Sequence, residues 1–266
     1  MLPLLGSLRR CFTGLLLGMT AGLAACGGGQ NATSGSTGDA ATADVSVLMM
    51  GNSHTSLGAL PEQLSQLLQA GLPGKKVAIV VAPGWLFLDE RAGDTPTLTL
   101  LQSQRWTAVV LQAQKYSSSG LVDYPTDGAE QLVKISRAQS ALPVMFPEWP
   151  RFGVDETQRI YALHVGIAQR QPACVPPIGQ AWDLALQRHP QLRLHDADGN
   201  HANTAGAYLS ALMLYAGITG GSPRTLPNLN FGVSAEDQAM LRSAAADTLS
   251  QISARQHCPN DARLIP

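Results

Sequence analysis

Ser53 lies in a short polar segment that could carry out nucleophilic chemistry. The segment reads Gly51-Asn52-Ser53-His54-Thr55 and directly follows an apolar run at residues 45–50. A serine on a turn between a strand and a helix has main-chain N–H groups nearby, and a nucleophile needs them because its tetrahedral intermediate carries a negative oxygen. The alternative is that Ser53 only caps the helix that follows it.

A second polar segment, at residues 195–201, reads HDADGNH. Asp198 and His201 are three residues apart, so one short loop can place both at the same edge of a sheet. A carboxylate can hold the imidazole in one tautomer while the other ring nitrogen takes a proton from a nucleophile. A polar turn that caps a helix is one alternative. A calcium loop is another, but His201 stands where its sixth position needs glycine, and Ala207 replaces the glutamate of the twelfth.

The elements that must position these segments alternate along the chain. Short apolar runs predict strands at 45–50, 76–82, 106–111 and 142–146, with a short fifth one at 173–175. Apolar residues at helical spacing predict helices at 57–71, 125–140, 155–169, 179–188, 205–215 and 234–254. Repeated β-α units predict a three-layer α/β/α sandwich with a mainly parallel, flavodoxin-like sheet of about five strands. A site in such a fold lies at the carboxyl ends of the strands.

The composition indicates a folded protein with few charges. Of 266 residues, 45% are hydrophobic and 14% are charged, against about 25% charged in an average soluble protein. This apolar content is enough to fill a core and argues against disorder for the bulk of the chain. Because 18 Lys and Arg are balanced by 19 Asp and Glu, we expect no basic patch for nucleic acid.

The first residues have the pattern of an exported protein. The apolar run at 11–25 follows two arginines and is shorter than the roughly 20 residues that span a bilayer, so we expect a signal peptide at 1–25. Leu23-Ala24-Ala25-Cys26 resembles the lipobox of bacterial lipoproteins, which implies a lipid on Cys26. Gly27 follows where aspartate would retain such a protein in the inner membrane, which favours the outer membrane, facing the periplasm. An ordinary signal peptide with a chance cysteine is the alternative.

The rest of the chain divides into a tether and one domain. Residues 27–44 are small or polar and typical of a flexible tether, so the lipidated Cys26 and its tether make up 26–44, and 45–266 form one globular domain. Beyond Cys11 in the leader and Cys26, the cysteines are Cys174 and Cys258. In an oxidising compartment we expect a disulfide between Cys174 and Cys258. Two unpaired thiols are the alternative.

The polar segments together resemble those of the SGNH (GDSL-type) hydrolases. Gly51-Asn52-Ser53 is similar to the first motif of that family, with Asn52 where aspartate is usual. Residues 198–201 fit its last motif, Asp-x-x-His. The resemblance implies Ser53 as the nucleophile, His201 as the base and Asp198 as the carboxylate that orients His201.

The resemblance also implies an oxyanion hole. Its donors would be the N–H groups of Ser53 and of Gly84, which follows the second strand. The third motif is normally Gly-x-Asn, but Gln112-Ala113-Gln114 stands at that place. Gln114 would then take the role of the asparagine, with Gln112 as the alternative. The loss of one such donor typically costs about 100-fold or more in rate.

Two functions from different classes follow. The first is a lipid-anchored serine esterase of the cell envelope that cleaves an ester, such as an acetyl or short acyl group on carbohydrate, without metal or organic cofactor. Its partners would be a small-molecule or carbohydrate ester and, through the lipid alone, a membrane. The second is a lipoprotein that keeps the hydrolase scaffold as a binding or envelope-structural module.

Overall fold

A four-stranded parallel sheet forms the centre of the domain. The computed structural model describes residues 37–265, so the expected signal peptide and the lipid site at Cys26 lie outside the described residues. The strand order is β2-β1-β3-β4, and neighbouring strands run parallel. The strands are β1 (Val45–Met50), β2 (Val77–Val81), β3 (Ala108–Leu111) and β4 (Leu142–Met145). The predicted parallel α/β sheet is therefore confirmed.

The fifth strand expected at residues 173–175 is reduced to a single bridge. Cys174 pairs in parallel with Val144 of β4 and forms no longer ladder. Pro172 precedes this segment, and Pro176 and Pro177 follow it. Because proline has no N–H to donate, it ends the pairing on both sides. Residues 37–265 therefore form a sheet of four strands, slightly fewer than predicted.

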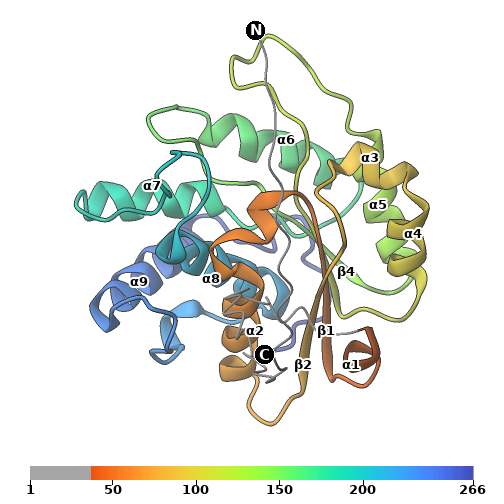
Figure 1. Ribbon diagram of the computed structural model, residues 1–266, viewed down its shortest axis with the longest axis horizontal. Helices are drawn as coiled ribbons and strands as arrows, with labels where there is room; N and C mark the ends of the chain where they lie inside the picture. Colours follow the sequence, from red (N-terminus) through yellow and green to blue (C-terminus); the bar gives the residue numbers. More distant parts are fainter. Residues whose placement is uncertain (1–36, 266) are drawn as a thin grey trace, which may run out of the picture. The chain divides into compact units, whose positions relative to one another are not determined.

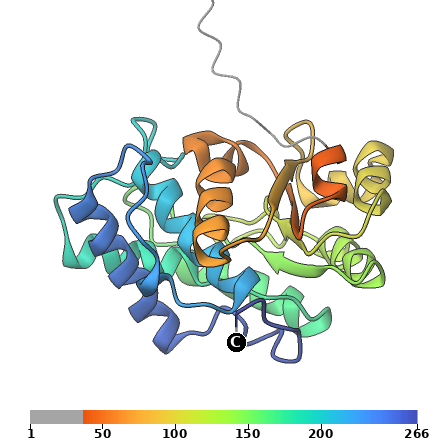
Figure 2. The same ribbon diagram turned by 90° about the horizontal axis from the view of Figure 1, so that it is seen from below.

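Helices cover both faces of the sheet, as Figures 1 and 2 show. The alternation of side chains along β1 divides the core: Val45, Val47 and Met49 belong to one apolar cluster, and Leu48 and Met50 to the other. The first cluster is completed by α2 (Leu60–Gly71), α7 (Ile178–Arg188), α8 (Thr204–Thr219) and α9 (Ala235–Gln251). The second is completed by α1 (Thr37–Ala41), α3 (Leu88–Gly93), α4 (Thr95–Gln102), α5 (Asp127–Ala138) and α6 (Thr157–Arg170).

Three of these helices depart from the sequence-based expectation. Helix α1 lies in the segment that we expected to be a tether, and its Ala40 is buried in the second cluster. Helix α1 is therefore packed on the domain although it precedes Val45. Helices α3 and α4 were not predicted because they are short and meet at Asp94, whose side chain accepts the N–H of Thr97 and starts α4.

Helix α8 is buried on nearly all sides. It packs against α2, α7 and α9, and every residue from Gly206 to Thr219 is buried. Despite this apolar character, none of the helices in the described residues is long and apolar enough to cross a membrane.

The predicted disulfide between Cys174 and Cys258 is present, and both cysteines are buried. It joins the bridge beside β4 to the C-terminal tail. The main chain supports the same junction, since Val175 donates its N–H to the carbonyl oxygen of Ala254 at 2.9 Å.

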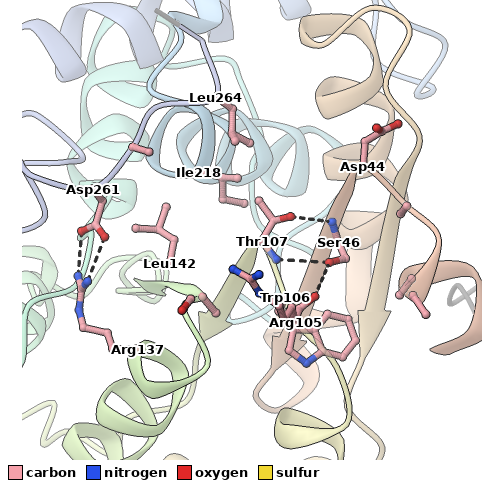
Figure 3. A pocket seen from close by; sticks show the side chains of 16 residues that line it. Asp44, Ser46, Arg105, Trp106, Thr107, Arg137, Leu142, Ile218, Asp261 and Leu264 are labelled. Atoms are coloured by element: carbon pink, nitrogen blue, oxygen red, sulfur yellow. Dashed lines mark hydrogen bonds and ion pairs between the residues drawn. The ribbon is translucent and has the colours of Figure 1, made fainter.

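A cavity of about 710 Å³ lies at the amino ends of the strands (Figure 3). Its lining includes a two-bonded ion pair between Arg137 and Asp261, with N–O distances of 3.0 and 2.9 Å. Ser46 and Thr107, at the starts of two strands, also line it and are hydrogen-bonded to each other. The cavity is therefore at the opposite edge of the sheet from the predicted site.

Candidate active site

Ser53 lies in a closed turn directly after β1. The turn is a short 3-10 helix over Ser53–Thr55, and the side chain of Asn52 accepts the N–H of His54 at 3.1 Å. The carbonyl oxygen of Asn52 accepts both the N–H and the hydroxyl of Thr55, at 3.1 and 2.6 Å. These bonds place the serine at the carboxyl edge of the sheet, where the sequence predicted it.

Glycine at position 51 leaves the space that neighbouring side chains of this turn occupy. A Cβ atom on Gly51 would lie 2.2 Å from Oε1 of Gln112 and 2.8 Å from Cγ2 of Thr55. The buried side chain of Arg91, on α3, donates from Nη2 to the carbonyl oxygens of Gly51 and Gly84, at 2.8 and 2.7 Å. Arg91 thus joins the ends of β1 and β2, a role that no feature of the sequence indicated.

The loop that carries Asp198 and His201 precedes α8. Asn203 caps α8 by accepting the N–H groups of Ala205 and Gly206. The loop is closed by the N–H of Asp196, which donates to the carbonyl oxygen of His201 at 2.8 Å. The packing of α2 against α8 then brings this loop to the serine turn.

That helix packing depends on close approach near the serine turn. Gly58 has φ +69°, and a Cβ on it would lie 2.8 Å from the Cβ of Ala207 and 3.0 Å from the carbonyl oxygen of Ala202. Glycine is suited to both the conformation and the lack of space. Gln63 of α2 adds a hydrogen bond to the carbonyl oxygen of Thr204, at 3.1 Å.

Ser53, His201 and Asp198 form a continuous chain of hydrogen bonds. Oγ of Ser53 is 2.8 Å from Nε2 of His201, and Nδ1 of His201 is 2.5 Å from Oδ2 of Asp198. An ionised carboxylate can only accept, so Nδ1 carries the proton and Nε2 is left to accept the hydroxyl of Ser53. This is the arrangement in which a histidine can remove the proton of a nucleophile.

Asp198 is held in its ionised form by its own loop. Its Oδ1 accepts the N–H groups of Asn200 and His201, each at 2.9 Å. The N–H of Asn200, the side chain of His201 and the N–H of His201 keep the pKa of Asp198 well below its ordinary value. The carboxylate keeps this state although its side chain is 48% exposed.

His54 and Trp149, which the sequence did not single out as functional, contact His201 and the residue before it. The ring of His54 stacks on that of His201, with centroids 5.0 Å apart. Burial, together with repulsion from a protonated His201, lowers the pKa of His54 to about 4. Trp149 is buried and donates from Nε1 to the carbonyl oxygen of Asn200 at 2.9 Å. The sequence feature that could have assigned His54 to the site is its position beside Ser53. For Trp149 the feature is its position just after a predicted strand.

Gly84 follows β2 next to the serine turn. Its φ of +75° favours glycine. Leu86, two residues later, donates its N–H to the carbonyl oxygen of Gly51 at 3.3 Å. Together with Arg91, this bond holds the Gly84 loop against the end of β1.

The side-chain amides of Gln112 and Gln114, the expected third oxyanion donors, make hydrogen bonds to other groups in this structure. Oε1 of Gln112 accepts the N–H of Asn52 at 2.8 Å, and its Nε2 donates to the carboxyl group of Glu148. Nε2 of Gln114 donates to the carbonyl oxygens of Lys115 and Pro125, at 3.0 and 3.1 Å. The expected oxyanion donor Gln114 therefore uses both of its N–H groups within its own loop, because the longer side chain reaches main-chain acceptors there.

Two exposed aromatic residues are hydrogen-bonded to the segments that carry Ser53 and Asp198. Trp85 is 65% exposed and donates from Nε1 to Oγ of Ser56, at 3.2 Å. Phe152 is 75% exposed, and its N–H donates to the carbonyl oxygen of Gly199 at 2.8 Å. One ring thus borders the serine turn and the other borders the aspartate loop.

Within residues 37–265, His, Cys, Asp and Glu side chains form no group of three or more that could hold a metal ion. The expected esterase chemistry requires none.

Comparison with known proteins identifies the fold. A candidate SGNH hydrolase from Slackia heliotrinireducens is 23% identical, with a TM-score of 0.52, over 64% of this chain and 97% of that one. A DUF4886 family protein from Bacteroides uniformis is 16% identical, with a TM-score of 0.56, over 77% of this chain and 95% of that one. No family model matches the chain, and no curated protein matches it. The chain therefore has the α/β/α fold of the SGNH hydrolases.

Proposed function

We propose that this protein is a serine esterase, and the hydrogen-bonded chain of Ser53, His201 and Asp198 carries the proposal. Oγ of Ser53 attacks the ester carbonyl carbon while Nε2 of His201 takes its proton. Asp198 stabilises the imidazolium that results. His201 then gives the proton to the leaving alcohol. In the second half of the reaction the same nitrogen takes a proton from the attacking water and gives it to Oγ of Ser53 as the bond from Oγ to the acyl carbon breaks, so the acid is released and the serine is restored.

The oxyanion of the tetrahedral intermediate needs hydrogen-bond donors close to Ser53. In this proposal they are the main-chain N–H groups of Ser53 and Gly84. The turn that holds Ser53 and the bonds from Arg91 to the carbonyls of Gly51 and Gly84 support this assignment, because they fix both segments relative to each other. Fixed donors do not have to reorganise as charge develops, which is the basis of their effect on rate.

The proposed substrate is an acetyl or short acyl ester of a carbohydrate. The rings of Trp85 and Phe152 are the supporting feature, since each is largely exposed beside the candidate site. The negative face of an aromatic ring attracts the positively polarised C–H groups on the face of a sugar ring. Two such rings beside one site suit an acyl group that is carried on a chain of sugar units.

The proposed location is the cell envelope, with a lipid on Cys26 as the anchor. The apolar leader and the lipobox-like residues before Cys26 support export. The buried disulfide of Cys174 and Cys258 also supports it, because disulfides persist in oxidising compartments.

A binding module is the second candidate. The observation that favours it is the engagement of Gln112 and Gln114, whose amide groups donate to Glu148 and to main-chain oxygens. A site with fewer oxyanion donors would hold an acylated ligand and hydrolyse it slowly.

Labelling with a fluorophosphonate probe separates the two candidates. The esterase proposal predicts that the wild-type protein is labelled and hydrolyses p-nitrophenyl acetate, and that Ser53→Ala loses both. Ser250→Ala is the matched control, because that exposed hydroxyl donates to the carbonyl oxygen of Asp247 on α9. An unlabelled wild-type protein that binds acetylated oligosaccharide without turnover would instead establish the binding module.

A further inference from the structure

Gln112 connects the serine turn to a carboxyl group on another strand end. Its side chain is fully buried. Oε1 accepts the N–H of Asn52 at 2.8 Å, and Nε2 donates to Oε2 of Glu148. Asn52 directly precedes Ser53, and Glu148 follows β4, so the connection crosses from β1 through β3 to β4.

The orientation of the Gln112 amide is determined by its partners. The N–H of Asn52 can only donate, so the atom that faces it must be Oε1. Nε2 must then point to Glu148, and Glu148 must present an oxygen there. The space is also closed on the glycine side, because a Cβ on Gly51 would lie 2.2 Å from Oε1. Gln112 therefore has one orientation in which both Oε1 and Nε2 are hydrogen-bonded, and Glu148 supplies the acceptor for Nε2 in that orientation.

The serine turn depends on this arrangement. If Nε2 loses its acceptor, Gln112 is free to turn toward another partner, and Oε1 leaves the N–H of Asn52. The position of Oγ of Ser53, 2.8 Å from Nε2 of His201, then loses a support one residue away. In a reacting pair, a displacement of about 1 Å can cost on the order of 100-fold in rate.

We propose that Glu148 is a positioning residue that acts through Gln112 to hold Ser53 within reach of His201. The expected effect on kcat rests on the esterase function proposed above. Glu148 acts through Gln112 on the geometry of the serine turn and makes no contact of its own with Ser53 or His201. Glutamine at position 148 can also hold Gln112, because an amide oxygen accepts a hydrogen bond.

Four variants test the proposal with p-nitrophenyl acetate. We expect Glu148→Ala to lower kcat by at least about tenfold, with KM within about twofold, and Glu148→Gln to stay within about threefold of wild type. Gln112→Glu removes the N–H donor of residue 112 and places two carboxyl groups together. We therefore expect its kcat to be lower than that of wild type, as in Glu148→Ala. The exchange Gln112→Glu with Glu148→Gln restores an N–H between the two side chains and should recover most of that loss.

Controls distinguish positioning from a loss of fold. Glu236→Ala removes an exposed carboxylate on α9 and should match wild type. All variants are compared at equal folded fraction, measured by circular dichroism. The proposal is overturned if folded Glu148→Ala keeps kcat within twofold, or if the exchange variant is no better than Gln112→Glu.

A second readout does not need activity. Hydrogen exchange of the Asn52 amide, followed by NMR, should be faster in Glu148→Ala than in wild type and unchanged in Glu148→Gln. If wild type shows no labelling of Ser53, the esterase proposal fails, and the exchange rate still decides whether Glu148 supports the turn. Equal exchange in wild type and Glu148→Ala would refute the role of Glu148.

Discussion

Replacing Asp198 with asparagine tests the proposed chemistry most directly, because the structure determines how the new amide must lie. Oδ1 of Asp198 accepts two main-chain N–H groups, from Asn200 and His201, each at 2.9 Å. These groups can only donate, so the oxygen of the amide takes the Oδ1 place. Its NH₂ group then faces Nδ1 of His201, from the position where Oδ2 lies 2.5 Å away.

The tautomer of His201 is therefore expected to reverse. An amide N–H that points at Nδ1 requires Nδ1 to accept, so the ring proton moves to Nε2. Nε2 can then no longer take the proton of Ser53. In serine proteases this substitution lowers kcat about 10⁴-fold, equivalent to about 5 kcal/mol of activation free energy. We expect a loss of that order here, with little change in KM or stability, because both main-chain bonds to the loop are kept.

The assay is hydrolysis of p-nitrophenyl acetate by purified Asp198→Asn, with thermal unfolding as the check on folding. Asp196→Asn is the matched control, because that exposed side chain accepts the N–H of Ala197 and lies in the same loop. It should remain within about threefold of wild type. A loss of less than tenfold in Asp198→Asn, or an equal loss in Asp196→Asn, would refute the reasoning.

Three further predictions concern the supports of the site and fold. Gly51→Ala forces a Cβ to within 2.2 Å of Gln112 Oε1, so we expect a loss of about 1–3 kcal/mol in the free energy of unfolding and slower labelling of Ser53; unchanged labelling would contradict this. Replacing Cys174 and Cys258 with serine removes a disulfide between residues separated by 84 positions. Because the disulfide restricts the unfolded chain, its loss should lower the free energy of unfolding by about 4 kcal/mol in urea denaturation. A decrease below about 1 kcal/mol would contradict this entropy argument. Burial raises the pKa of Glu148 from 4.5 to about 7, so between pH 4.5 and pH 7 the folded protein keeps a proton that the unfolded chain loses. Over that interval we expect the stability of wild type relative to Glu148→Gln to fall by at most about 3 kcal/mol. Urea titrations at pH 5 and pH 8 measure that difference, and an equal difference at both would contradict the raised pKa.

The parts of the fold that the sequence predicted are those decided by local pattern. Apolar runs identified the four strands of the described residues, because a strand buried on both faces is apolar at nearly every position, as β1 is except at Ser46. Helices α3 and α4 escaped prediction because they are short and depend on a cap at Asp94. Helix α1 escaped because its small residues read as a tether, and the burial of Ala40 depends on packing against the second core cluster.

The site shows a similar division. Ser53, Asp198 and His201 were identifiable because each has a residue type and local spacing that suits its chemistry. The environment of Gln112 and Gln114 was not identifiable, since either amide could have pointed toward the oxyanion. The partner of Gln112, Glu148, comes from another strand end, and the partners of Gln114 are carbonyl oxygens of its own loop, at Lys115 and Pro125, so both depend on how these loops fold and pack.

The sequence by itself therefore determined the alternation of strands and helices, the edge of the sheet that carries the site and the residue types available there. Tertiary structure alone decided that Ser53 and His201, 148 positions apart, lie 2.8 Å from each other, because that distance depends on the packing of α2 against α8. It also decided the role of Arg91, whose buried guanidinium joins two strand ends. Local patterns report which face of an element is apolar, whereas a hydrogen bond between distant segments depends on the summed geometry of every element between them.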